Sequence, residues 1–548
     1  MAEDTHTAEP NQDARRGSRW RELYKTEDWW AVWIGFAILL FAVAVAGFHG
    51  HVKAPSIQRW TTNPLDAFYS DVTVKVKDWP ETLRSATALK AALPRETADQ
   101  LRYKRKVRYE EGQRKTSETI GWKSRRPMSE ADRDAILPTL ASGAHRKAIE
   151  QLYRDTQTPK PNFMAMAVLM VVLGAGFALA VAMMGGRARS FATGYLVIFL
   201  LGILAYLIAD QGTMKAYGLP YALWALVFGL LISNTIGTPK WLLAGSKTEL
   251  FIKTGLVLLG AEILFSKIVM LGSRGVLVAW LVTPCVILFM YFFGTRVLKM
   301  TSKSLVIIVA AATSVCGVSA AIATAAAVKA KKDELTLTVG MTLIFTVLMM
   351  IAMPPAIKAV GMGEQVGGAW MGGTIDATGA VVAAGALLGD NAEIVAAVVK
   401  MIQNILIGLV AFCVAVVWVT NIERDPQAAH PSVMEIWYRF PKFIVGFVAA
   451  SLLFSFVLIP VFGGGLQGLN AVEKDVIGAV TKTCRGWLFC LAFVAIGLES
   501  DFRQLAGQMA GGKPIVLYLV GQGFNLILTL IAAYLAFGGW LFDAIPMN

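Results

Sequence analysis

Thirteen long apolar segments recur along the sequence, and this pattern limits what the chain can fold into. Each is close to the roughly 20 residues that an α-helix needs to cross a hydrocarbon core about 30 Å thick. The hydrophobic fraction of 55% and the charged fraction of 16% also lie outside the soluble range. The predicted fold class is therefore an all-α integral membrane protein. We predict thirteen transmembrane helices, over residues 29–48, 162–183, 191–210, 219–237, 250–270, 275–295, 303–328, 335–357, 367–388, 393–420, 442–462, 475–498 and 513–537.

One polar segment, residues 49–161, interrupts the apolar pattern. Its sequence, for example ADQLRYKRKVRYEEGQRK over 98–115, is charged with scattered Leu, Tyr and Val. We predict solvated helices there rather than a catalytic domain. The predicted organisation is a cytoplasmic tail over 1–28, a first transmembrane anchor over 29–48, a helical extracytoplasmic segment over 49–161 and a transmembrane core over 162–548.

The basic residues predict an orientation. Five Lys and Arg side chains within residues 15–25 precede the first span, which favours a cytoplasmic N-terminus. Alternating the spans from there places most later basic loops in the cytoplasm, but Lys329, Lys331 and Lys332 would emerge outside. Either the number of spans is wrong nearby, or segment 303–328 does not cross in the ordinary way. We predict a multi-pass protein of the inner (plasma) membrane.

Several classes of chemistry are disfavoured by composition and motifs. The five cysteines lie in or at the edges of predicted spans and the five histidines lie outside them, so neither a disulfide framework nor a metal cluster is indicated. The net charge of +13 fits cytoplasmic loops and anionic lipid rather than nucleic acid. No motif of a soluble enzyme or an ATPase is present. We therefore expect no enzymatic activity and no cofactor.

The stretch TSVCGVSAAIATAAAVKAKKDE, residues 313–334, crowds small and hydroxyl-bearing residues inside an apolar run. A helix can break at membrane depth only where protein encloses the break. A break there would expose the N–H groups of a second half-helix, which can hold an anion. Tight packing of small residues is the alternative explanation. The candidate substrate-binding residues are Thr313, Ser314, Cys316, Gly317 and Ser319.

Charged residues within the spans are the second group of candidates, because an ionised group at the bilayer centre costs at least about 2.5–3.5 kcal/mol. Asp376 lies in the glycine-rich segment GGTIDATGAVVAAGALLG, and we predict that it binds a coupling ion together with Glu499 and Glu262. Lys400 is predicted to balance charge in the substrate site. For Glu262 and Glu499 the alternative is simple solvation close to a membrane interface.

Two short stretches resemble each other. VLLGAEILF at 257–265 and VAIGLESDF at 494–502 share Val, Gly, Glu and Phe at equivalent positions, and an odd number of predicted spans separates them. An odd offset means opposite orientation, which is the arrangement of inverted repeats in secondary transporters. Chance similarity between apolar helices is the alternative.

The stretch at 313–334, the motifs DATGAVVAAGALLG and AAVVKMIQN, and the closing LFCLAFVAIGLESDFRQL together resemble the sulfate exporter family of YeiH-type membrane proteins, over roughly residues 191–537. The resemblance implies an architecture like that of sodium-proton antiporters and bile-acid symporters, with two discontinuous helices that cross near the midplane. It would place the breaks at Cys316–Gly317 and at Gly497–Glu499. Residues 375–379 lack a histidine common in the family, and Asn404 stands where an arginine is common.

The resemblance implies a secondary transporter, most simply an exporter, of a small anion such as sulfate or an organosulfonate. A cation-proton antiporter that uses the intramembrane carboxylates is one alternative, and a membrane sensor or scaffold acting through residues 49–161 is another. The expected partners are a small inorganic or organic anion, a coupling proton or sodium ion, and the lipid bilayer. No nucleic acid is expected, and homo-oligomerisation is left open.

Overall fold

The computed structural model divides into two compact units. The polar unit comprises Pro55–Val172 and Tyr206–Leu219, and the membrane unit comprises Met1–Ala54, Leu173–Ala205 and Pro220–Asn548. The structure describes residues 23–48, 53–69, 72–76, 93–110, 113–122, 126–140, 143–158, 161–217, 219–418, 420, 437, 440–501, 512–539 and 541–543. Most of the predicted tail over 1–28 lies outside these residues.

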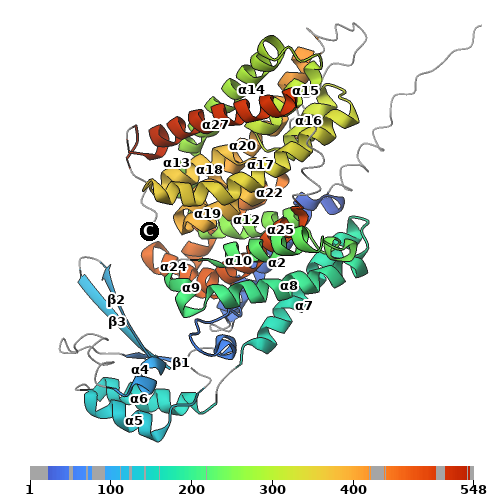
Figure 1. Ribbon diagram of the computed structural model, residues 1–548. Coiled ribbons are helices and arrows are strands. Elements are labelled where there is room, and N and C mark those ends of the chain that lie inside the picture. Colours follow the sequence, from blue (N-terminus) through green and yellow to red (C-terminus); the bar gives the residue numbers. More distant parts are fainter. Residues whose placement is uncertain are drawn as a thin grey trace, which may run out of the picture. The chain divides into compact units, whose positions relative to one another are not determined.

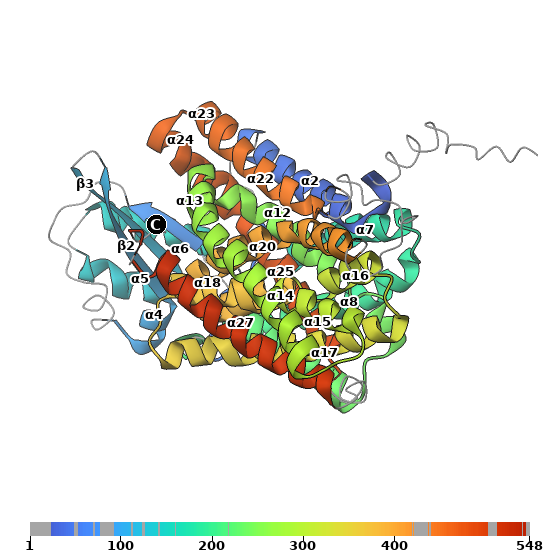
Figure 2. The same cartoon turned by 90° about the horizontal axis from the view of Figure 1, so that it is seen from above.

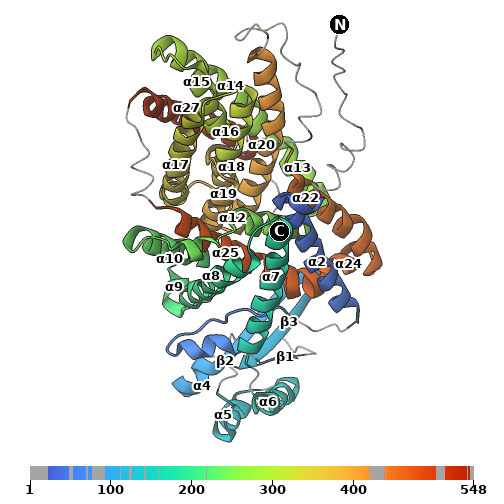
Figure 3. The ribbon, with the colours of Figure 1, turned by 90° about the vertical axis from the view of Figure 1, so that its right-hand side faces the viewer.

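The polar unit combines helices with a three-stranded antiparallel sheet (Figure 3). The strands are β1 (Val72–Val76), β2 (Leu101–Glu110) and β3 (Gln113–Trp122), in the order β1-β3-β2. The helices are η1 (Pro64–Phe68), α4 (Arg95–Gln100), α5 (Glu130–Ile136), η2 (Leu137–Thr139), α6 (Gly143–Thr156) and α9 (Gly212–Ala216). Leu101, Ile120 and Trp122 from the sheet and Ile149 from α6 are completely buried and form the centre of its core.

The prediction of solvated helices is wrong for residues 98–115, most of which form β2 and β3. Leu101, Tyr103, Val107 and Tyr109 occupy alternate positions, which is the period of a strand with one apolar face. This alternation, rather than a helical period, is the pattern of the apolar residues in this segment.

The membrane unit consists of helices, and nine helices in the described part of the chain are long and apolar enough to cross a membrane. This confirms the class of a helical, multi-pass integral membrane protein with discontinuous helices. The nine comprise α2 (Glu27–Phe48), α7 (Phe163–Met183), α8 (Ala188–Ala209), α13 to η4 (Phe265–Val297), α17 (Lys332–Ala359), α20 (Asp390–Val417), α22 to α23 (Lys442–Val461), most of α24 to α25 (Gly465–Glu499) and α27 (Lys513–Phe537).

Some of these long helices contain π-helical turns, and shorter helices complete the unit. Within Phe265–Val297 the elements are α13 (Phe265–Val276), η3 (Leu277–Leu281), α14 (Val282–Phe292) and η4 (Phe293–Val297). The later ones are α22 (Lys442–Leu452), η6 (Leu453–Leu458), α23 (Ile459–Val461), α24 (Gly465–Ala471), η7 (Val472–Thr481) and α25 (Lys482–Glu499). The shorter helices are α10 (Tyr221–Thr235), α11 (Lys240–Leu243), α12 (Thr248–Glu262), α15 (Lys303–Ser314), α16 (Val318–Ala327), α18 (Glu364–Thr374) and α19 (Thr378–Leu388).

Helices α15 and α16 form a re-entrant hairpin, and they lie side by side in Figures 1 and 3. Ile308 of α15 packs in one cluster with Ala321 of α16 and with Val328 directly after α16, so α16 runs back along α15. Ser304 at the start of α15 donates to Glu334 at the start of α17 at 2.8 Å. The segment therefore enters the membrane, turns at residues 315–317 and returns to the side from which it came.

Helices α18 and α19 form a second hairpin. A Cβ atom added at Gly367 of α18 would lie 2.8 Å from the side chain of Leu388 at the end of α19. One added at Gly389 would lie 2.5 Å from Glu364 at the start of α18. The two outer ends of this hairpin are thus adjacent, and its turn lies at residues 375–377.

The two hairpins enter from opposite ends of α17. This helix has 28 residues, a length of about 42 Å at 1.5 Å per residue, and it connects the end of the first hairpin to the start of the second. The predicted spans 303–328 and 367–388 are therefore hairpins rather than crossings, which corrects the count of thirteen. The hairpin also explains the basic residues that had broken the orientation pattern, because Lys329, Lys331 and Lys332 stay on the side of Arg296.

The predicted break at Gly497–Glu499 is wrong, because α25 is continuous up to Glu499. The second discontinuity is the turn around Asp376. The first six residues of each similar stretch lie on α12 and α25. These helices run antiparallel, since Ser246 before α12 contacts Glu499 and Glu262 at its end contacts Arg485. Opposite orientation agrees with the expected inverted repeat, which stays a prediction. Figure 2 shows α2 and α22 side by side next to α12.

Candidate functional site

The tips of the two hairpins meet inside the membrane unit. Gly317 at the first tip has a φ of +58°, which disfavours other residues. A Cβ atom there would lie 2.6 Å from Thr342 of α17 and 3.1 Å from Asp376 at the second tip. Glycine is therefore required both by the turn and by the close approach of the second hairpin.

Helix α20 holds both tips. The ammonium of Lys400, only 1% exposed, donates to the backbone carbonyl of Val315 at 2.6 Å and to the side chain of Gln403 at 2.8 Å. The amide of Gln403 donates in turn to Ser314 O of the first hairpin and to Gly373 O of the second, at 2.9 and 3.1 Å. The carbonyls that end α15 and α18 carry partial negative charge, so these donors satisfy groups that would otherwise be buried without partners.

Helix α27 presents a polar stripe to the same place. Tyr518 donates its hydroxyl to the carboxylate of Asp376. Gln522 donates to Thr374 O at 3.1 Å, and Asn525 donates to Thr313 O at 3.2 Å. These three residues are spaced four and three positions apart, so they share one face of the helix. Both hairpin tips are thus fixed from two sides, by α20 and by α27.

The second halves of the hairpins begin at the tips. Helix α16 begins at Val318 and α19 at Thr378, so two helix N-termini with partial positive charge lie near the Lys400 ammonium. Asn404, one turn beyond Lys400, donates to the Thr378 hydroxyl at 3.0 Å. Two helix N-termini and one buried cation are suited to holding a small anion.

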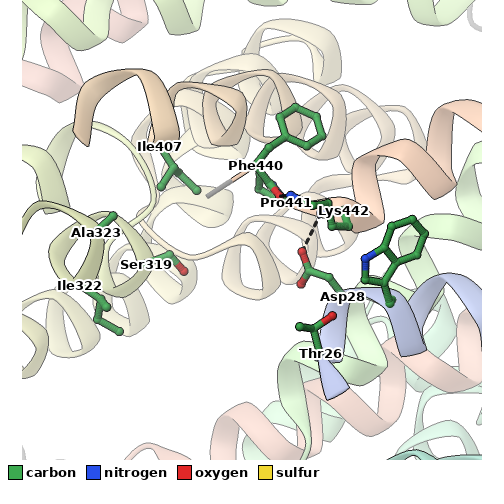
Figure 4. A pocket seen from close by; sticks show the side chains of 10 residues that line it. Thr26, Asp28, Ser319, Ile322, Ala323, Ile407, Phe440, Pro441 and Lys442 are labelled. Carbon is green, nitrogen blue, oxygen red and sulfur yellow. Dashed lines mark hydrogen bonds between the residues drawn. The ribbon is translucent and has the colours of Figure 1, made fainter. Parts of the chain in front are cut away.

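A cavity of about 500 Å³ approaches the tips from the side of the membrane unit where α2 begins (Figure 4). Its hairpin-side wall includes Ser319 and Ala323 of α16 and Ile407 of α20. The opposite wall includes Asp28 and Lys442, from the starts of α2 and α22. Ser319 is two residues from the tip glycine, and Ile407 is one turn from Asn404. The cavity therefore ends about one helical turn from the tips on both elements.

The structure places the predicted substrate residues at or near the first tip, but not all in the predicted way. The hydroxyls of Thr313 and Ser314 donate to Val309 O and Ala310 O of their own helix, both at 2.8 Å. Their backbone carbonyls, rather than their hydroxyls, face the neighbouring helices. Cys316 is buried in an apolar cluster, whereas Ser319 is exposed to the cavity.

Two of the predicted coupling residues have their described partners away from the tips. Glu262 accepts from Arg485 Nε at 2.9 Å, and the same guanidinium contacts Glu393 of α20. Glu499 accepts from Ser246 and Thr248, at 2.6 and 3.0 Å. Of the predicted carboxylates, the structure brings Asp376 to the hairpin tips.

Sequence reasoning missed most of the amide side chains at the site. Gln403 and Asn404 follow Lys400 at the i+3 and i+4 positions of α20. The stripe of Tyr518, Gln522 and Asn525 recurs at helical spacing in an apolar span. This periodic placement of polar residues could have identified them, because amide side chains inside a transmembrane helix usually form hydrogen bonds to neighbouring helices.

These features define a class, namely helical multi-pass membrane proteins in which two opposed re-entrant hairpins enclose a buried polar centre. Within that class the chain belongs to the UPF0324 family of membrane proteins. A family model described as "Conserved hypothetical protein 698" matches residues 193–518. No solved structure matches the chain.

The relatives extend this similarity beyond the matched core. A UPF0324 membrane protein of Rhodopirellula baltica is 47% identical over 529 residues, which cover 95% of this chain and 91% of the relative. One of Nitratidesulfovibrio vulgaris is 50% identical over 404 residues, covering 73% and 69%. One of Nitrosomonas europaea is 30% identical over 399 residues, covering 65% and 78%. The first alignment covers nearly the whole chain, so it takes in the polar segment as well as the hairpins.

Proposed function

We propose that the chain is a secondary transporter of a small anion such as sulfate or an organosulfonate. The observation that carries this proposal is the meeting of two opposed hairpin tips around Lys400. Two helix N-termini and the Lys400 ammonium can replace part of the hydration shell of an anion at membrane depth. In this proposal the chain lies in the inner membrane with its N-terminus in the cytoplasm, and it exports its substrate.

The cavity supports a path to this site. It reaches Ser319 from the side where α2 begins, which is the cytoplasmic side in the proposed orientation. In the opposite half of the unit, Arg485 joins Glu262 of α12 to Glu393 of α20. An opening on one side combined with closed contacts on the other is what alternating access requires.

The test is thermal unfolding of the purified protein with sulfate, sulfite, taurine or chloride as the variable anion. A ligand that binds only the folded state raises the melting temperature in proportion to the logarithm of its concentration above Kd. We expect one anion class to do so, and we expect Lys400→Met to abolish the shift. Lys358→Met is the matched control, because Lys358 is exposed and lies outside the site. The absence of both saturable stabilisation and anion counterflow in vesicles would reject the proposal.

A cation-proton antiporter is the second candidate, favoured by the buried carboxylate of Asp376 at the second tip. A buried carboxylate can exchange a proton for a metal cation as the path opens to either side. Proton flux in reconstituted vesicles separates the two candidates. Proton flux that responds to sodium but not to sulfate supports the antiporter. Proton flux that responds to sulfate but not to sodium supports the anion transporter.

A further inference from the structure

The polar groups between α17, α27 and the hairpin tips include oxygen atoms without partners. The Tyr518 hydroxyl and the Gln522 amide nitrogen both donate hydrogen bonds. In contrast, the side-chain oxygens of Thr342, Thr346 and Gln522 have no hydrogen-bond partner in the described part of the chain. The three residues are at most 5% exposed. Buried oxygens are normally satisfied, so a group of unpaired ones points to something that they bind.

The residues that carry these oxygens lie around the hairpin tips. The methyl group of Thr342 and the Cβ atom of Asp376 both approach the Gly317 position. Thr346 is one turn further along the same face of α17. Gln522 lies between Thr374 O of the second hairpin and the sulfur of Met349, on the next turn of that face of α17.

The orientation of the Gln522 amide is determined by its surroundings. A backbone carbonyl can only accept a hydrogen bond, so the amide nitrogen must face Thr374 O and the oxygen must face elsewhere. The contact with Thr374 O therefore identifies which end of the amide is the oxygen, and that oxygen has no hydrogen-bond partner in the described part of the chain.

We propose that Asp376, Thr342, Thr346 and Gln522 bind one monovalent hard cation, sodium, at the hairpin tips. One carboxylate supplies a single negative charge, and the hydroxyl and amide oxygens supply neutral ligands of the type that hard cations prefer. This site rests on the proposed function, because the cation would bind at the same hairpin tips as the transported anion. It uses the acceptor oxygens on the α17 and α27 side, whereas the anion would use the donors near Lys400 and Asn404.

The site would connect the second hairpin to α17, which also contacts the first hairpin. Asp376 belongs to the second tip, and Thr342 lies against the first. A cation bound by both residues neutralises the carboxylate and links the second tip to α17, against which the first tip packs. Sodium binding is therefore expected to stabilise the anion site, and reciprocal coupling requires the anion to raise sodium affinity by the same factor.

The test measures the melting temperature of the full-length protein in sodium, potassium or choline chloride at constant ionic strength. We expect a saturable rise with sodium that is absent with choline, and its loss in the Thr342→Val, Thr346→Val double variant. Thr342→Ser keeps the oxygen and is expected to retain the rise. Thr338→Val is the matched control, because Thr338 is buried one turn earlier on α17 and its hydroxyl already donates to Glu334 O.

The outcomes separate this site from the proposed function. A flat sodium response in the wild type, or one that persists in the double variant, overturns the cation site. If the double variant does not fold, Thr342→Ser and radioactive sodium binding to the wild type decide the matter. The anion response is measured separately in choline salts, so a flat anion response alongside a saturable sodium response rejects the anion transporter and leaves the cation site.

Discussion

A few buried charged side chains connect helices that are distant in the sequence. Arg485 is the clearest case, because its guanidinium bridges Glu262 of α12 and Glu393 of α20. Their side chains are 7–11% exposed. One cation between two buried carboxylates makes the group sensitive to any loss of the cation.

We predict that Arg485→Met lowers stability by about 3–5 kcal/mol, because it leaves two buried carboxylates without their partner. Thermal or denaturant unfolding of the purified protein measures this. Lys482→Met on the same helix is the control, since Lys482 and Asp390 are 58% and 86% exposed and their pair is worth less than about 1 kcal/mol. Equal losses for the two variants would show that Arg485 has no special role.

At the level of single residues, the sequence identified site residues whose type is unusual inside an apolar span. A glycine and hydroxyls in an apolar run indicated the first tip, and charges in spans indicated Asp376 and Lys400. Glu262 and Glu499 were identified by the same rule, yet their contacts lie elsewhere, because charge alone does not say which partner a residue meets. The amides of α20 and α27 carry no charge, so only their helical spacing could have revealed them.

The hairpins are the elements that matter most for the site, and the tight turn of the first one depends on Gly317. Gly317→Ala is expected to destabilise the protein by at least about 1–2 kcal/mol, which is the cost of the left-handed conformation for an L-residue. The added methyl group must also displace Thr342, which adds to this cost. Gly176→Ala in α7, where a methyl meets nothing within 4 Å, is expected to be neutral or slightly stabilising. The melting temperatures of the two variants test this, and a Gly317→Ala protein as stable as the wild type would contradict the geometry.

Hydropathy could locate both hairpins but could not distinguish them from spans. A re-entrant hairpin of two half-helices contains about as many apolar residues as one crossing helix. Its reversal depends on contacts with α17 and α20, which are remote in the sequence. The one local signal was the cluster of Lys329, Lys331 and Lys332, whose charges are on the wrong side for a crossing helix.

In the polar unit, α5 begins with a capping box in which Ser129 and Asp132 bond each other's backbone N–H groups. Burial raises the pKa of Asp132, but hydrogen bonds from Thr97 and Ser129 outweigh it and hold the pKa below its ordinary value. A depressed folded-state pKa contributes stability above the unfolded value of about 4, and this stability is lost as the pH falls through the folded value.

Hydrogen exchange of α5 peptides in the full-length protein is therefore expected to speed up, after correction for intrinsic rates, as the pH falls below about 4. Asp132→Asn is expected to exchange faster at pH 7 and to lose most of this pH dependence. Glu130→Gln, an exposed neighbour on the same helix, serves as the control. Unchanged exchange in Asp132→Asn at pH 7 would show that the carboxylate does not stabilise α5.

The membrane unit as a whole connects an open side to a closed side through α20. Ile407 of this helix lines the cavity, and Glu393, 14 residues earlier and so about 21 Å away, contacts Arg485. The sequence predicted the membrane class, but not this pairing, because Arg485 and Glu393 are 92 residues apart in the sequence. If α20 moves with the hairpins, the contact with Arg485 holds the molecule in the state that opens the cavity.

Cysteine labelling tests this coupling. Ser319→Cys is expected to react with a membrane-impermeant thiol reagent added on the side of the N-terminus, because Ser319 is exposed to the cavity there.

Adding Glu393→Gln weakens the contact with Arg485, and a contact worth about 1–3 kcal/mol changes a two-state ratio about 5- to 150-fold. Labelling should then slow, because its rate follows the fraction of molecules with the cavity open. Asp390→Asn, which removes an exposed pair on the same helix and leaves the contact between Glu393 and Arg485 in place, should leave the rate unchanged. Equal rates in all three backgrounds, with each protein folded, would mean that the contact is structural and does not couple the two sides.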